Sequence, residues 1–158
     1  MKNTFKRSGA ALISLVLLLV LAVSAGAASS QNVGVKFWKE RSDKESMANS
    51  GIDPDRTATL TRQANGTYTL TLPVRQVSKL GVTGYLSGLT IGDVTYDGTL
   101  TGDFNKATAV LTIKNLPASV LTGSDVNKSV LVTCNIQMDL QVLGEINTSA
   151  RMCIWNQK

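Results

Sequence analysis

Few residues in this chain could do chemistry, and histidine is not among them. None of the 158 residues is His, which removes the commonest general base and the commonest metal and haem ligand. The sequence also has no Gly-x-Ser-x-Gly, Cys-x-x-Cys or His-Glu-x-x-His motif and no P-loop. Carboxylates do occur close together, as in Asp53 with Asp55 and Asp93 with Asp97, but such pairs in loops are usually solvated turn residues. We therefore expect that the protein is not an enzyme.

Soft and aromatic side chains are the better candidates for a functional site. Met47, Met138 and Met152 carry flexible, polarisable thioethers, and Tyr85, Tyr96 and Trp155 could line a slot for a small molecule. The alternative for each of these residues is ordinary packing in the core or at a strand edge. The residue types thus favour binding over catalysis.

Residues 1–27 have the layout of a secretory signal peptide. Basic residues precede an almost wholly apolar run over 10–23, and Ala25-Gly26-Ala27 offers a small-x-small cleavage site. The alternative is an uncleaved N-terminal anchor, because the apolar run is nearly long enough to span a bilayer. We expect cleavage, contact with the membrane only before cleavage, and a secreted or envelope-associated product. Its residues 28–158 have the size of one domain.

The positive charge of the chain carries no functional information. Three of the positive charges behind the formal net charge of +5, Lys2, Lys6 and Arg7, lie in the predicted signal peptide. The remaining charges are scattered, and no Lys/Arg cluster alternates with aromatic residues. Nucleic acid is therefore excluded as an expected partner.

Cys134 and Cys153 both lie in the predicted exported part of the chain. An oxidising compartment favours a disulfide over a metal or catalytic role for two such residues. If the last two strands form a hairpin centred on Leu143-Gly144, the two cysteines lie directly opposite each other, within reach of a disulfide. The alternative is a pair of reduced core cysteines.

Short strands account for most of residues 28–158. Alternating apolar residues predict strands over 57–61 and 67–72, with Asn65-Gly66 as the hairpin turn between them. The longest alternation runs from Val130 to Leu140 and predicts a strand with one buried face. We expect an all-β protein, an antiparallel sandwich. Its other strands and a further turn are expected over 33–38, 85–91, 107–114 and 148–155 and at Asp97-Gly98.

The segment SDKESMANSGIDP, residues 42–54, is different from its surroundings because it carries helix signals. Ser42 and Glu45 have the spacing of a capping box. Gly51 and Pro54 provide a stop signal. We expect one or two turns of helix near the N-terminus of the domain.

The order of these features resembles the NEAT (near-iron-transporter) family of bacterial cell-surface domains. The similarity rests on Ser46-Met47, on Gly66-Thr67-Tyr68 and on the segment from Gly81 to Leu86. It implies an immunoglobulin-like sandwich that holds haem between a short helix and the hairpin of the last two strands.

The resemblance also assigns candidate haem-pocket residues. Ser46 and Met47 would face the ligand from the helical segment, and Tyr85, Met138 and Met152 would complete the site. The alternative is that the segment plugs an open end of the sandwich, with Met47 as core.

One departure from the family pattern concerns the iron ligand. Haem-binding members carry a Tyr-x-x-x-Tyr motif at the start of the final strand, and this chain has no Tyr after Tyr96. The candidate ligands near the last hairpin are then Met138, Met152 or a reduced Cys153. A neutral thioether holds ferric haem less well than a phenolate.

Two functions follow from these observations. The first is an exported NEAT-like binding module for haem, or another apolar small molecule, in iron acquisition at the cell surface. The alternative is a structural or protein-interaction sandwich that binds another envelope protein and no haem. A pocket bounded by residues 42–50 and the last hairpin would favour the first, and a filled end would favour the second.

Overall fold

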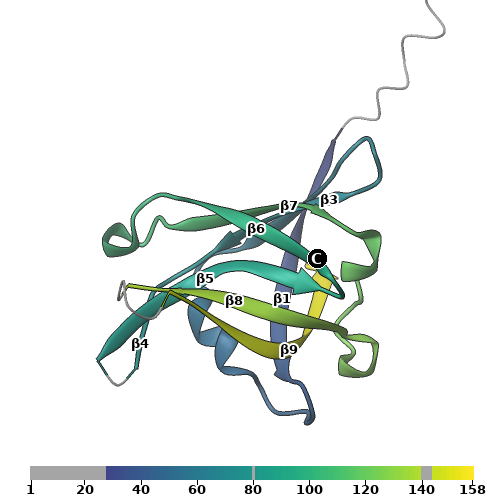
Figure 1. Ribbon diagram of the computed structural model, residues 1–158. Helices are drawn as coiled ribbons and strands as arrows, with labels where there is room; N and C mark the ends of the chain where they lie inside the picture. Colours follow the sequence, from purple (N-terminus) through teal and green to yellow (C-terminus); the bar gives the residue numbers. More distant parts are fainter. Residues whose placement is uncertain (1–27, 80, 140–143) are drawn as a thin grey trace, which may run out of the picture.

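The structure is a computed structural model, and it describes residues 28–79, 81–139 and 144–158. Within these ranges it contains nine strands and four short 3₁₀ segments (Figure 1). The strands are β1 (Ser29–Lys39), β2 (Ala58–Arg62), β3 (Tyr68–Pro73), β4 (Val77–Lys79), β5 (Val82–Ile91), β6 (Val94–Thr101), β7 (Val110–Leu116), β8 (Val130–Met138) and β9 (Glu145–Asn156). The 3₁₀ segments are η1 (Met47–Gly51), η2 (Phe104–Lys106), η3 (Ala118–Val120) and η4 (Val126–Lys128). The predicted all-β class is confirmed.

The strands form one antiparallel sheet that closes on itself. Its order is β5-β6-β7-β3-β2-β1-β9-β8, and β8 pairs again with β5. β4 pairs with β5 outside this ring. The predicted sandwich is therefore corrected to a barrel-like closed sheet with one additional strand. Closure pairs the two strands that would otherwise be exposed edges of the sheet.

β5 allows the sheet to close because it pairs along both of its edges. Most of the strand pairs with β8 and its last residues pair with β6, with a register shift between Leu86 and Gly88. Such a bulge bends the strand and increases its twist. A Cβ on Gly88 would lie 2.7 Å from the carbonyl oxygen of Tyr96, so a larger residue would push these two strands apart.

Three Gly-containing turns were predicted; Leu143-Gly144 falls partly outside the described residues, and one of the other two forms. At Asn65-Gly66 the chain reverses with Gly66 at φ +83°, and the Gln63 amide donates to the Thr67 carbonyl oxygen over 2.8 Å. The predicted turn at Asp97-Gly98 is wrong, because both residues lie inside β6. A Cβ on Gly98 would lie 2.3 Å from Cδ1 of Leu111, so this glycine makes room for a core side chain of β7.

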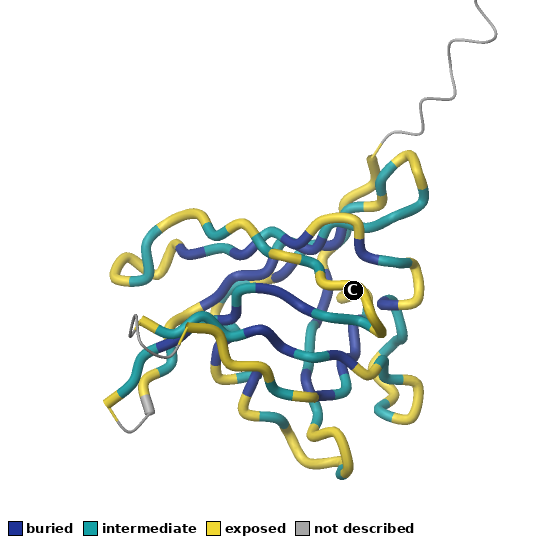
Figure 2. The backbone as a smooth tube through the Cα atoms, viewed as in Figure 1, coloured by how far each residue is buried: buried dark blue, intermediate teal, exposed yellow. Residues whose placement is uncertain are grey.

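The core is built from buried residues of the strands of the closed sheet, and Figure 2 shows how the buried stretches follow these strands. Along β8, Val132 and Cys134 are buried, as the alternation predicts, but Ile136 and Met138 near its end are only half-buried. This end of β8 is where the pocket described below lies. The largest fully buried side chains come from strands and from η3: Phe37, Leu60, Leu70, Leu72, Leu89, Leu111, Ile113, Leu116, Met152, Ile154, Val33 and Val120.

The predicted disulfide does not form. Cys134 pairs with Thr148 across β8 and β9, and Cys153 lies an odd number of residues further along β9. Side chains alternate between the two faces of a strand, so the two cysteines point to opposite faces of the sheet. Both are buried free thiols, and Cys153 Sγ donates to the Asp125 carbonyl oxygen over 3.5 Å. The alternative of reduced core cysteines is the one the structure supports.

The predicted short helix near the N-terminus is corrected: this segment forms only a 3₁₀ segment of five residues, η1. Its N-cap is Ser46, whose Oγ accepts from the Ala48 amide over 3.3 Å. Ser42 and Glu45 therefore do not form the expected capping box, and the Glu45 carboxylate instead pairs with the Lys36 ammonium group of β1.

The predicted signal peptide, residues 1–27, lies outside the described residues. In the ranges that the structure does describe, no helix is long and apolar enough to cross a membrane. The strands of the ring and its core all lie between Ser29 and Asn156. A chain that begins at Ala28 therefore contains the complete closed sheet.

Candidate functional site

An apolar pocket of about 330 Å³ lies between η1 and the end of the sheet nearest β4. This volume is in the range of small-molecule binding sites. η1 forms one wall, and the strands β4, β5, β8 and β9 form the rest. The lining residues are Met47, Ala48, Gly51, Val77, Val82, Gly84, Tyr85, Leu86, Ile136, Met138, Ile146 and Thr148.

We call Ser46 together with η1 the lip, because this segment borders the pocket on the side away from the strands. Asn49 attaches the lip to β1. Its Oδ1 accepts from the Phe37 amide over 2.8 Å and its Nδ2 donates to the Phe37 carbonyl oxygen over 2.7 Å. The Ser46 amide donates to the same carbonyl oxygen over 2.9 Å. β2 pairs with β1 only as far as Val33. Beyond that point, the Asn49 side chain forms the hydrogen bonds with the Phe37 backbone that a neighbouring strand would otherwise form.

The other end of the lip is attached to the segment after β3. The Arg75 amide donates to the Gly51 carbonyl oxygen over 3.0 Å, and the Arg75 Nε donates to the Ser50 carbonyl oxygen over 2.8 Å. Ile52 forms a single β-bridge with Val74. The lip is therefore held at both ends by backbone hydrogen bonds.

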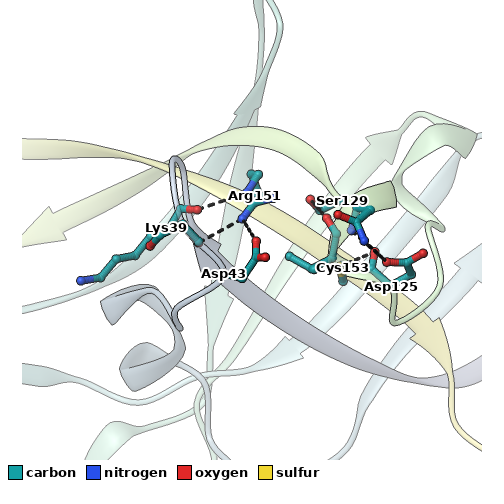
Figure 3. A network of polar contacts seen from close by, with 9 residues as sticks. Lys39, Asp43, Asp125, Ser129, Arg151 and Cys153 are labelled. Carbon is teal, nitrogen blue, oxygen red and sulfur yellow. Dashed lines mark hydrogen bonds and ion pairs between the residues drawn. The ribbon is translucent and has the colours of Figure 1, made fainter.

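The loop before the lip is fixed by Arg151 of β9 (Figure 3). Its guanidinium donates to the Lys39 carbonyl oxygen over 3.1 Å and to the Ser42 carbonyl oxygen over 3.0 Å. It also forms an ion pair with Asp43 over 2.7 Å. A planar guanidinium suits several acceptors in one loop, so Arg151 ties the approach to the lip to the final strand.

Met47 and Met138 bring two thioethers to the pocket from different walls. Met47 is on the lip and is 58% exposed, whereas Met138 is at the end of β8 and half-buried. Gly84 of β5 pairs with Met138, and a Cβ on Gly84 would lie 2.8 Å from the Met138 sulfur. The absence of a side chain at Gly84 therefore lets this sulfur lie over β5. The alternative in which Met47 is core is wrong.

The other predicted site residues have different positions. Ser46 caps η1 and does not line the pocket. Tyr85 lines the pocket, but its ring also contacts Phe104, with ring centroids 5.2 Å apart. Met152 is fully buried in the core and is not a lining residue. Cys153, the third candidate iron ligand, is buried beside Asp125. Tyr96 and Trp155 do not line the pocket.

Sequence reasoning missed most of the apolar lining. Ile136 shares the alternating face of β8 with Met138, so the strand pattern contained that signal. Ile146 of β9 pairs with Ile136 of β8, which only the register of these two strands reveals. Asn49 was also missed, because nothing local distinguishes it from a solvated Asn.

The pocket has little charge and little capacity for acid–base chemistry. Among the described residues that line it there is no carboxylate, ammonium, guanidinium or thiol, and no group of His, Cys, Asp and Glu in the described ranges could hold a metal ion. Burial raises the pKa of the Cys134 thiol from 9.0 to about 12, so it stays protonated at neutral pH. The arrangement suits the binding of an apolar molecule.

Comparison with known proteins gives a likeness in fold. No protein-family model matches the sequence, and no curated protein matches it significantly. Among solved structures, the chain is similar to the NEAT5 domain of IsdX2, a Bacillus anthracis hemophore, in complex with heme. The TM-score is 0.53 at 11% sequence identity, over 83% of this chain and 98% of that domain. A mutant of the same domain with heme gives the same TM-score, identity and coverage. The chain therefore has a NEAT-like fold.

Proposed function

We propose that this protein is a binding module that holds haem, or a closely related flat apolar ligand, in the pocket behind the lip. The observation that carries the proposal is the position of the pocket. It lies between a short 3₁₀ segment and the last two strands, which is where the resemblance to NEAT domains implies a haem site. The solved domains with a similar fold are complexes with heme.

The apolar lining of the pocket suits the flat faces of a porphyrin, but the chain lacks the tyrosine that ligates the iron in haem-binding NEAT domains. Apolar side chains such as Val77, Leu86 and Ile136 line it, and burial of apolar ligand surface against them is favourable. No Tyr follows Tyr96 in the sequence, and the chain has no His. Among the lining residues, Met47, Met138 and Tyr85 carry the side chains that could hold the iron of a bound haem. When bound, haem would supply a metal centre that this chain otherwise lacks in the described ranges.

The proposed role is binding without catalysis, outside the cytoplasm. The charge-free lining supports the first part, since it offers no general acid or base. The layout of residues 1–27 supports the second. The two cysteines give no support for an oxidising compartment, because they are free thiols on opposite faces of the sheet. Delivery of haem iron to the cell is the role we propose for such a module.

The test is a titration of the purified protein with haem, followed by Soret absorbance. The expected result is a shifted, saturable band at one haem per chain. Leu86→Asp places a carboxylate in the apolar lining and is expected to abolish the band. Leu131→Asp is the matched control, because Leu131 is 57% exposed and does not line the pocket. Spectra identical to free haem at every ratio would contradict the proposal.

The second candidate is a protein-interaction module of the cell envelope that binds no haem. The observation that favours it is the missing tyrosine ligand after Tyr96. Failure of the haem titration in a folded protein would move the assignment to this function.

A further inference from the structure

One stretch of β9 remains open along one of its edges although the sheet is closed. β9 pairs with β8 from Glu145 to Met152, but with β1 only from Ala150 to Asn156. The hairpin of β8 and β9 therefore extends beyond the end of β1. Along residues 145–149, no strand within the described ranges lies on the side of β9 opposite β8.

The register shows which backbone groups of this stretch are unpaired. The Met138 amide donates to the Gly144 carbonyl oxygen over 3.1 Å, and in an antiparallel ladder every second pair exchanges hydrogen bonds in the same way. Ile146 and Thr148 therefore bond to β8. Among the described residues, no backbone group outside β8 bonds to the residues that alternate with these two. The amides and carbonyl oxygens that point to the open edge are those of Glu145, Asn147 and Ser149.

This edge lacks the features that usually keep exposed strands from pairing. Natural edge strands carry Lys, Pro, a bulge or an inward-pointing charge. Residues 145–149, Glu-Ile-Asn-Thr-Ser, include no Lys and no Pro, and their pairing with β8 is regular throughout. The residues on the pocket side are uncharged, and one of them, Ile146, is 44% exposed. The edge can therefore accept another strand.

We propose that two copies of this chain pair through the open edges of β9, in antiparallel orientation about a two-fold axis at Asn147. The stretch is complementary to itself in this register. Asn147 faces Asn147 of the second copy, and Glu145 of each copy faces Ser149 of the other. Each of these pairs exchanges both of its backbone hydrogen bonds, and no two like charges face each other.

The geometry of the hairpin limits the overlap to this stretch. β9 begins at Glu145, and Lys39 of β1 occupies the edge from Ala150 onward. On the pocket side of the sheet, Ile146 of one copy lies opposite Thr148 of the other, which covers part of its exposed surface. The two pockets then lie on the same side of one continuous sheet. This inference does not depend on what the pockets bind.

Sedimentation velocity of the purified protein over a range of concentrations tests the dimer. Residues 145–149 of each copy form a smaller interface than the standard of about 1,600 Å², so we expect a weak, reversible dimer whose population grows with concentration. Hydrogen exchange provides the local measurement. Exchange of the Asn147 and Ser149 amides should slow as the protein concentration rises, whereas the Thr148 amide, which bonds to β8, should not change.

Substitutions at Ser149 should have effects of opposite sign, which a merely structural role would not produce. Ser149→Glu places a carboxylate opposite Glu145 of the second copy and is expected to weaken the dimer about tenfold. Ser149→Lys places an ammonium group there and should strengthen the dimer, less so at high salt. Adding Glu145→Lys to Ser149→Glu makes the facing charges opposite and should restore the dimer. Leu131→Asp is the control, because Leu131 is 57% exposed but lies on β8, outside the stretch.

Three outcomes would contradict the pairing of the β9 edges. A single monomeric species at every concentration up to about 1 mM would overturn the proposal. A dimer that Leu131→Asp weakens as much as Ser149→Glu, or that no substitution affects, would show that association uses another surface. Exchange at Asn147 that does not depend on concentration would overturn the proposal even if a variant failed to fold, because that measurement uses the unmodified chain.

Discussion

Asn49 is the side chain on which the position of the lip depends most. In Asn49→Ala the lip loses the two hydrogen bonds to Phe37, which measure 2.8 and 2.7 Å. The Phe37 carbonyl oxygen keeps the Ser46 amide as a donor, whereas the Phe37 amide loses its acceptor. Each hydrogen bond contributes roughly 0.5–1.5 kcal/mol, and an unsatisfied buried donor costs about 1–3 kcal/mol. We expect the free energy of unfolding to fall by about 2 kcal/mol.

The assay is urea denaturation at equilibrium, with hydrogen exchange of the Phe37 amide as a local measurement. Asn65→Ala is a matched control, because Asn65 Oδ1 also accepts two hydrogen bonds, from the amide and the hydroxyl of Thr67. Those bonds are exposed, so the control should lose less than about 1 kcal/mol. The Phe37 amide should exchange faster in Asn49→Ala alone. Equal losses in both variants, or unchanged exchange at Phe37, would refute the role given to Asn49.

Three further predictions concern single side chains of the pocket and the core. Met47→Ala should lower the free energy of unfolding by less than about 1 kcal/mol, because Met47 is 58% exposed. Met152→Ala in the core should lower it by about 2–5 kcal/mol in the same urea titration. Similar losses in the two variants would place Met47 in the core. Gly84→Ala puts a Cβ 2.8 Å from the Met138 sulfur and 2.9 Å from the Gln137 backbone carbonyl oxygen. Because the backbone oxygen cannot move away easily, we expect a loss of about 1–3 kcal/mol and a displaced Met138 methyl resonance in NMR spectra. An unchanged resonance would show that the contact with Met138 is absent. Burial raises the pKa of the Cys134 thiol in the folded protein from 9.0 to about 12. The thiol therefore loses its proton at lower pH in the unfolded chain, and the stability of the protein should fall as pH rises from 9 toward 12. Cys134→Ala should be less stable at neutral pH but should lack this part of the pH dependence.

The strands of this protein were largely predictable from the sequence, because alternation is a local property. The face of β8 that carries Val132 and Cys134 and the Asn65-Gly66 hairpin both follow from neighbouring residues. The same alternation placed Ile136 and Met138 on one face. It could not show that this end of the face borders a pocket instead of core, because the wall opposite comes from η1, far away in the sequence.

In the candidate site, Met47 and Met138 could be predicted from the sequence, but Asn49, which holds the lip in place, could not. Met47 and Met138 were chosen for their side-chain chemistry, and both line the pocket. Met152 has the same chemistry but lies in the core, since its position on β9 turns it toward Phe37 of β1. Asn49 binds a backbone group on β1, and such a contact has no sequence signature.

The sequence by itself determined the all-β class, most strands, the hairpin at Asn65-Gly66 and the small number of residues that could act in catalysis. Each of these features depends on composition or on residues close together in the chain. The tertiary structure alone decided how the strands meet. The pairing of β5 with β8 closes the sheet, and the register of β8 on β9 turns Cys134 and Cys153 to opposite faces. The physical reason is that register and closure depend on the packing of residues distant in sequence. A shift by an odd number of residues leaves the local pattern of a strand unchanged while reversing which side chains meet.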